Sequence, residues 1–133
     1  MKKIFLLSML VTILVSCSSE NDNIPDDTSG NIQGTWQLKA EYIGGVRQSL
    51  SECRLNENMS FDGTAVIAVK SDETGNVNCN LSTQEGTFIR TGTNLSIAFT
   101  NENLKSKIKE LTTVKLVLIP ENSDKTFEYE RAK

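Results

Sequence analysis

From residue 35 onward, hydrophobic and polar positions alternate in short runs that are separated by turn sequences. The clearest run spans 95–99, where leucine, isoleucine and phenylalanine alternate with serine and alanine. Alternation with a period of two is typical of a β-strand that has one buried and one solvent-facing side. Pairs such as Asp62-Gly63 stand between runs, and they favour tight hairpins. The pattern therefore predicts an all-β sandwich or barrel of short antiparallel strands.

Eight runs of this kind predict eight strands. The expected strands span 35–43, 58–61, 64–69, 84–90, 95–100, 104–111, 114–119 and 126–131. Strict alternation along the first strand would place four side chains on one face, namely Trp36, Leu38, Ala40 and Tyr42. In the last hairpin, the side chains expected to point inward are Leu116, Leu118, Phe127 and Tyr129.

The segment 104–111 carries two competing patterns. Its leucine and isoleucine residues fall at helical spacing, whereas Lys105, Lys107 and Lys109 alternate as they would on a strand. We expect a strand because the segment is short and has no strong helix cap, and a helical turn is the alternative. As a strand, it would carry these lysines on a solvent-facing side or on a protected edge.

The N-terminal segment has a different pattern. Two lysines at positions 2 and 3 precede a short apolar stretch that ends in Leu14-Val15-Ser16-Cys17. The stretch is too short to span a bilayer as a helix and is typical of an export signal. Its end resembles a bacterial lipoprotein signal, which implies that residues 1–16 are removed and that Cys17 is lipidated. An ordinary secretory signal or an uncleaved membrane anchor are the alternatives.

The segment 17–31 is polar and acidic after its cysteine, and it contains Pro25 and Gly30. Such a composition has too few apolar residues to pack, so we expect a flexible tether between the lipidated cysteine and a single domain at 32–133. The lipoprotein resemblance implies attachment to the membrane through the lipid. It also implies a location in the bacterial cell envelope, at the outer membrane, facing either the periplasm or the cell surface.

Composition argues against several classes of function. The chain contains no histidine, and histidine is the usual general base, the usual zinc ligand and a member of most catalytic triads. It also has neither a phosphate-binding glycine loop nor a catalytic-serine elbow. A formal net charge of −3 disfavours nucleic acid as a partner. We therefore expect a protein that is not an enzyme, with no metal site and no cofactor.

Two cysteines remain once Cys17 is assigned to lipid. An exported protein works in an oxidising compartment, so Cys53 and Cys79 are expected to form a disulfide. In the chain-entropy model this bridge would stabilise the fold by about 3.5 kcal/mol. A metal pair is the poorer interpretation, because no histidine or further cysteine is present to complete a site.

Several short motifs resemble a known family. They are Gly34-Thr35-Trp36, Phe61-Asp62-Gly63-Thr64, Gly86-Thr87-Phe88, Ile108-Lys109-Glu110-Leu111-Thr112 and Leu116-Val117-Leu118. Together they resemble the small lipocalin-like lipoproteins of Gram-negative bacteria over about 32–131. This resemblance implies an eight-stranded antiparallel up-and-down barrel. In it, Trp36 of the Gly-x-Trp signature plugs the closed end and Arg131 packs over the tryptophan, and an exposed terminal arginine is the alternative.

The resemblance also implies that the barrel interior or its open mouth holds a small hydrophobic molecule. The candidate lining residues are those expected to point inward: Leu38, Tyr42, Phe61, Val66, Phe88, Ile97, Phe99, Leu116 and Phe127. The alternative is a filled barrel that serves as a scaffold, with loops that contact a protein or glycan. An empty cavity of about 300 Å³ or more would favour the carrier, and a packed interior would favour the scaffold.

Overall fold

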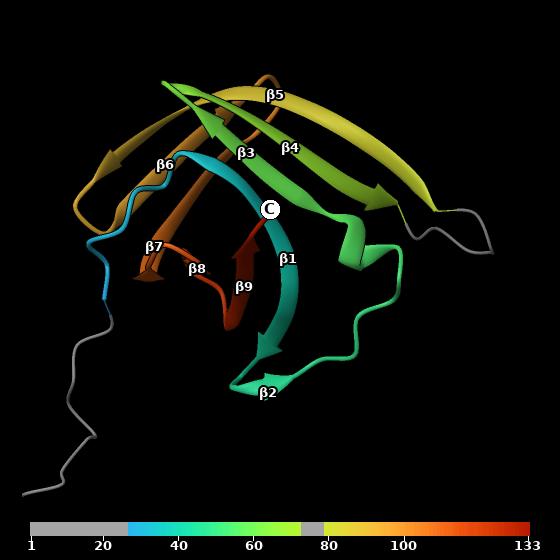
Figure 1. Cartoon of the computed structure of the whole chain (residues 1–133). Helices are drawn as coiled ribbons and strands as arrows, with labels where there is room; N and C mark the ends of the chain where they lie inside the picture. The colour runs from blue at the N-terminus through green and yellow to red at the C-terminus, as the bar shows by residue number, and fades with distance from the viewer. Residues whose placement is uncertain (1–26, 73–78) are drawn as a thin grey trace, which may run out of the picture.

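The computed structural model describes residues 27–72 and 79–133. These residues form nine β-strands and one short 3₁₀ turn, joined by loops (Figure 1). The strands are β1 (Gly34–Ile43), β2 (Val46–Arg47), β3 (Asn58–Asp62), β4 (Ala65–Asp72), β5 (Asn80–Thr91), β6 (Asn94–Phe99), β7 (Asn103–Leu111), β8 (Lys115–Pro120) and β9 (Lys125–Arg131), and the turn is η2 (Arg54–Asn56). Within this described part, no helix is long and apolar enough to cross a membrane.

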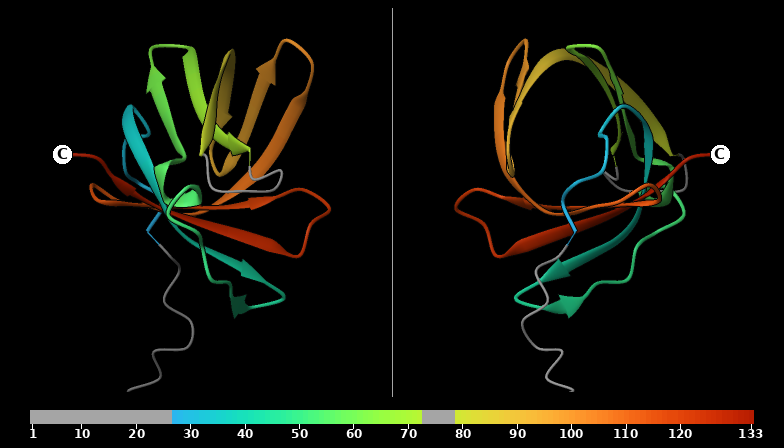
Figure 2. Two further views of the ribbon diagram at one scale, coloured as in Figure 1. Left: turned by 90° about the vertical axis from the view of Figure 1, so that its right-hand side faces the viewer. Right: turned by 60° about the vertical axis from the view of Figure 1, so that its left-hand side comes forward.

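The sheet closes on itself. Strands β3 to β9 pair antiparallel in sequence order, and β1 pairs with both β3 and β9. The two residues of β2 extend the sheet beside the end of β1. The resulting ring of eight strands is visible in the right-hand view of Figure 2. This arrangement confirms the eight-stranded antiparallel barrel expected from the sequence, and β7 shows that the ambiguous segment 104–111 forms a strand.

Register explains how the alternating pattern fills the interior. Phe61 lies opposite Val66, and Phe88 lies opposite Ile97. Because directly opposite residues share a face of the sheet, these side chains point together into the barrel. The rings of Phe61 and Phe88 meet edge to face, with centroids 4.9 Å apart. Gly63 holds the turn before β4 with a φ of 60°, a conformation that glycine adopts without steric cost.

A β-bulge in β1 corrects one expectation. Leu38 lies opposite Tyr129, but Ala40 then lies opposite Glu128 and Glu41 opposite Phe127. An extra residue in one strand shifts its alternation by one position. Beyond the bulge, Glu41 therefore shares the inward face of Phe127, and Tyr42 lies on the other face. The expectation that Trp36, Leu38, Ala40 and Tyr42 share one face is wrong for this reason.

Trp36 closes one end of the barrel. Its side chain is fully buried, and its indole Nε1 donates a 2.7 Å hydrogen bond to the carbonyl of Ile32. The Arg131 guanidinium lies 4.2 Å from the centre of the indole ring, which is a cation–π distance. At Gly34, φ is +117°, and a Cβ atom would lie 2.5 Å from Nη1 of Arg131. Glycine at this position thus gives the arginine room to cover the tryptophan.

Residues 27–31, which the composition grouped with the tether, lie against this closed end. Leu111 N donates to Asp27 O at 2.7 Å, and Gly30 N donates to Leu111 O at 2.8 Å. The Arg90 guanidinium donates to the carbonyls of Gly30 and Thr28 at 3.0 and 2.8 Å. The predictions for residues 1–16, for Cys17 and for the rest of the tether fall outside the described residues.

Within 27–72 and 79–133, the described contacts are sufficient to close the barrel and fill its core. The closure of β1 on β9, the core cluster, the tryptophan plug and the disulfide all join residues of these ranges. A unit with its own closed sheet and its own core folds independently. Binding experiments on the chain from Ser18 to Lys133 therefore test the intact barrel.

Candidate functional site

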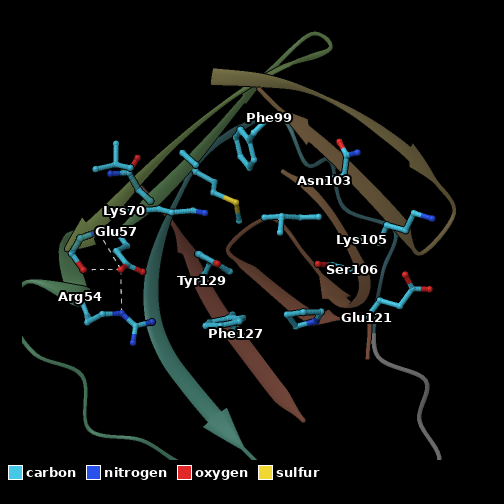
Figure 3. Close-up of a pocket in the computed structure, with 17 residues that line it drawn as sticks. Arg54, Glu57, Lys70, Phe99, Asn103, Lys105, Ser106, Glu121, Phe127 and Tyr129 are labelled. Carbon is cyan, nitrogen blue, oxygen red and sulfur yellow. Dashed lines mark hydrogen bonds and ion pairs between the residues drawn. The ribbon is translucent and has the colours of Figure 1, made fainter. Parts of the chain in front are cut away.

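A cavity of ≈ 500 Å³ opens at the end of the barrel opposite Trp36 (Figure 3). Its volume lies within the range of small-molecule sites, about 300–1,000 Å³. The apolar part of its wall comes from strands β3, β4, β6, β7 and β9 and includes Met59, Ala68, Phe99, Leu104 and Phe127. A cavity of ≈ 500 Å³ is larger than the size of about 300 Å³ that favours a carrier over a filled scaffold.

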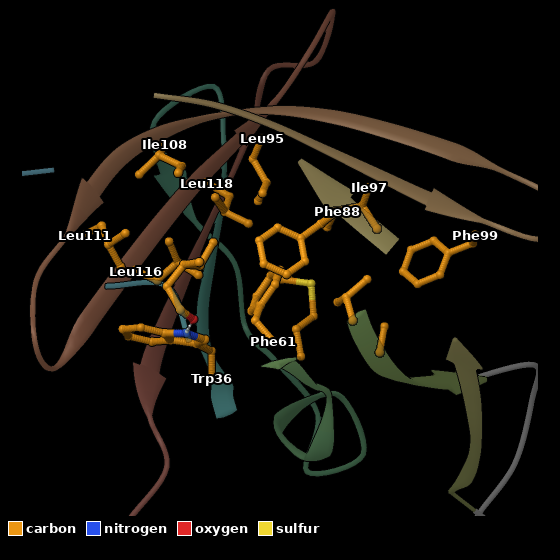
Figure 4. Close-up of a cluster of buried hydrophobic side chains, with 14 residues drawn as sticks. Trp36, Phe61, Phe88, Leu95, Ile97, Phe99, Ile108, Leu111, Leu116 and Leu118 are labelled. Atoms are coloured by element: carbon orange, nitrogen blue, oxygen red, sulfur yellow. Dashed lines mark hydrogen bonds between the residues drawn. The ribbon is translucent and has the colours of Figure 1, made fainter. Parts of the chain in front are cut away.

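The closed half of the barrel is packed instead of hollow. A cluster of buried apolar side chains packs against Trp36 and extends from it to Phe99, which lines the cavity (Figure 4). Leu111 and Leu116 are fully buried next to the plug, and Phe61 is only 2 % exposed. Interiors packed in this way leave no room for a ligand. The barrel is therefore divided into a solid closed half and an open half that contains the cavity.

One wall of the cavity is polar, and we call the residues Glu41, Arg54, Glu57 and Tyr129 the polar corner. Arg54 donates from Nη1 to Glu41 at 2.9 Å and from Nε to Glu57 at 3.1 Å. The Glu57 carboxylate also accepts hydrogen bonds from the backbone and hydroxyl of Ser71, at 3.2 and 2.7 Å. Arg54, Glu57 and Tyr129 line the cavity, and Glu41 is buried behind them with 5 % exposure.

Burial and the charges of the polar corner shift the pKa values of Tyr129 and Arg54. Burial raises the pKa of the Tyr129 hydroxyl, and the carboxylates of Glu57 and Glu41 raise it further against a smaller opposing effect of Arg54. Burial by itself would lower the pKa of Arg54, but its hydrogen bonds and charge interactions with Glu41 and Glu57 outweigh that effect and raise it. At neutral pH the corner therefore presents a charged guanidinium and a neutral hydroxyl.

The rim of the cavity carries charges of both signs. Lys70 forms an ion pair with Glu102 at 2.7 Å, and its Nζ lies 5.6 Å from the ring centre of Phe99. Lys105 and Glu121 also line the cavity, and neither forms an ion pair within the described ranges. Lys105 lies opposite Ser96 on the outward face of β7, so it reaches the cavity only at the rim. Apart from the polar corner, the wall of the cavity is largely apolar, and its mouth is polar.

The structure separates the predicted lining residues into groups. Two line the cavity, Phe99 and Phe127. Five belong to the packed cluster: Phe61, Val66, Phe88, Ile97 and Leu116. Leu38 is buried outside that cluster, and Tyr42 lies on the face away from Phe127 because of the bulge in β1.

Of the polar corner, the sequence pattern indicated only Tyr129, which was expected to point inward. Arg54 lies in η2, outside the strands, so no periodicity places it. Glu41 points inward only because the bulge shifts the alternation of β1, and charged residues are seldom buried. One further signal was Glu57, which has the strand parity of Met59 but lies just before β3 begins.

The predicted disulfide is confirmed. Cys53 and Cys79 are bonded, with Cα atoms 5.3 Å apart and a sequence separation of 26 residues. Cys53 immediately precedes η2, and Cys79 immediately precedes β5. The bridge therefore fixes the segment that carries Arg54 to the wall of the barrel.

Comparison with known proteins agrees with this architecture. A family model described as a lipocalin-like domain matches residues 32–118, and no curated protein matches. A solved structure of a lipocalin-like protein from Bacteroides uniformis is similar, with 18% identity and a TM-score of 0.60 over 77% of this chain and 100% of that chain. An uncharacterized protein from Bacteroides eggerthii is similar at 14% identity and a TM-score of 0.59, with the same coverage of both chains. At such identities the likeness shows the fold alone.

Proposed function

Because the chain belongs to the family of lipocalin-like domains, we propose that its barrel binds or carries a small hydrophobic molecule in the cavity at its open end. The observation that supports this function is the ≈ 500 Å³ cavity itself, next to a closed half that is packed. A barrel that served only as a scaffold would have no need to leave one half of its interior open. We also propose that the protein is not an enzyme.

Apolar walls give the cavity its driving force. Met59, Ala68 and Phe99 are almost fully buried in the fold, yet they face the open volume. A ligand that covers them removes apolar surface from water, which contributes about 0.8 kcal/mol per CH₂ group buried. The cavity is thus suited to a molecule with an alkyl or ring body.

Titration with N-phenyl-1-naphthylamine, a neutral dye that fluoresces in apolar surroundings, tests this function. The chain from Ser18 to Lys133 is expected to bind the dye saturably. Ala68→Phe should weaken binding about tenfold or more, because the added ring fills the cavity. The matched control Ala98→Phe adds the same ring to an exposed position of β6 and should leave binding unchanged. Absence of saturable binding, or equal binding by both variants, would contradict the proposal.

We also propose a site of action, because the N-terminal segment resembles a bacterial lipoprotein signal. The proposal places the protein in the bacterial cell envelope, held at the outer membrane by lipid on Cys17 after removal of residues 1–16. Metabolic labelling with an alkyne fatty acid should mark the full chain, and Cys17→Ser should abolish the label. A Cys17→Ser chain that remained labelled would contradict lipid anchoring at this residue.

A further inference from the structure

The polar corner has more negative than positive charge at the cavity wall. One guanidinium, that of Arg54, is shared between the carboxylates of Glu41 and Glu57. Lys125 approaches Glu41 at 3.7 Å from a solvent-exposed position, where its charge is screened by water. An anionic ligand group brought to this corner would meet two carboxylates and a guanidinium that is already paired with both. The corner is therefore unfavourable for an anionic group.

The rest of the cavity offers no excess of positive charge. Lys70 is paired with Glu102, and Lys105 shares the rim with the oppositely charged Glu121. The lining residues and their direct ion-pair partners together comprise three cations and four carboxylates: Arg54, Lys70 and Lys105 against Glu41, Glu57, Glu102 and Glu121. Burying a charged head group without an excess of opposite charge is costly.

What the wall does offer is a neutral hydrogen-bonding group. The hydroxyl of Tyr129 has no hydrogen-bond partner among the residues of 27–72 and 79–133, and its side chain lines the cavity (Figure 3). Burial and the adjacent carboxylates keep it protonated, since they raise its pKa. A protonated hydroxyl both donates and accepts a hydrogen bond. It can therefore satisfy a ligand hydroxyl, carbonyl or amide.

We infer that the ligand of this cavity is an uncharged amphiphile, with an apolar body against Met59 and Phe99 and a neutral oxygen-bearing head at Tyr129. This inference rests on the proposed function and specifies its ligand class. A long-chain alcohol, a ketone or an amide fits the site, whereas an ionised fatty acid or an alkyl ammonium ion does not. The lack of excess positive charge at the mouth and the unpartnered Tyr129 hydroxyl on the wall both favour an uncharged head group.

Displacement of the bound dye by three ten-carbon ligands separates these classes. At pH 8, decanol should displace N-phenyl-1-naphthylamine at a concentration about tenfold or more below that of decanoate or decylamine, because only decanol enters without a charge. Lowering the pH to 4.5 protonates part of the decanoate and should narrow its difference from decanol. Equal or stronger displacement by decanoate at pH 8 would overturn the inference and leave the proposed function standing. If the dye itself failed to bind, both the proposed function and the inferred ligand class would be contradicted.

Variants locate the head group. Tyr129→Phe keeps the ring and removes the hydroxyl, so decanol binding should weaken about threefold to tenfold while dye binding is retained. Tyr42→Phe removes a hydroxyl from the face of β1 that points away from Phe127, so it should change neither decanol binding nor dye binding. Glu57→Gln removes a carboxylate that repels an anion, so it should reduce the preference for decanol over decanoate. Glu130→Gln, at an exposed position on β9, should leave this preference unchanged. Unchanged decanol binding in Tyr129→Phe would overturn the inference.

Discussion

At the closed end of the barrel, contacts in the structure explain why Trp36, Gly34 and Arg131 occupy their positions. Trp36 is fully buried and uses its only donor on Ile32 O, and Gly34 leaves the space that Arg131 occupies. The Arg131 guanidinium also donates to the carbonyls of Asn31 and Thr113, both at 2.7 Å. A single side chain thus joins the N-terminal segment, the turn before β8 and the plug.

Removing that side chain tests its role. Arg131→Ala should lower the free energy of unfolding by about 2–4 kcal/mol, because it loses a cation–π contact and several charge-assisted hydrogen bonds. The emission of Trp36 should change at the same time, since water then reaches the indole. Arg47→Ala, at an exposed position of β2, is the matched control and should change neither quantity. An Arg131→Ala protein with wild-type stability and emission would contradict this role.

The roles of individual residues could largely be predicted from the sequence at the closed end of the barrel. At the open end, few of them could. The Gly-x-Trp motif and a basic residue near the last strand were enough to suggest the plug. Arg54 and Glu41 gave no comparable signal, because their partnership joins β1 to a loop 13 residues further along the chain. Contacts of this kind depend on the closed barrel and not on local pattern.

Among the elements, the strands were the most predictable and their irregularities the least. Alternation from Leu95 to Phe99 corresponds to β6, in which buried and exposed residues alternate without a break. In β1, Ala40 and Tyr42 continue the apolar alternation of Trp36 and Leu38, so the sequence shows no interruption where the bulge occurs. The bulge is set by pairing with β9, and only the three-dimensional structure reveals it.

The loop between β2 and β3 gains its position from the disulfide. Cys53 lies next to Arg54 at the start of η2, and the bridge holds this turn against the wall of the barrel. Arg54 then fixes Glu57 and Glu41 by ion pairs of 3.1 and 2.9 Å. An element of three residues with no buried side chain thus positions the polar corner.

At the scale of the whole molecule, the two ends of the barrel differ in structure and in role. The described chain enters at the closed end, where Asp27 is hydrogen-bonded to Leu111. The cavity lies at the opposite end, beside the turn from β6 to β7. A tether that begins upstream of Asp27 would therefore attach to the closed end and leave the cavity facing away from the anchor.

Methyl NMR of the chain from Ser18 to Lys133 during a decanol titration tests the central claim most directly, because it reports which half of the barrel the ligand enters. We predict saturable shifts for methyl groups of Met59, Ala68 and Leu104, which line the cavity, and none for Leu111 and Leu116, which are packed beside Trp36. Shifts confined to outward-facing methyl groups such as those of Ile67, Ile89 and Val114, or no saturable shifts, would contradict a binding cavity at the open end.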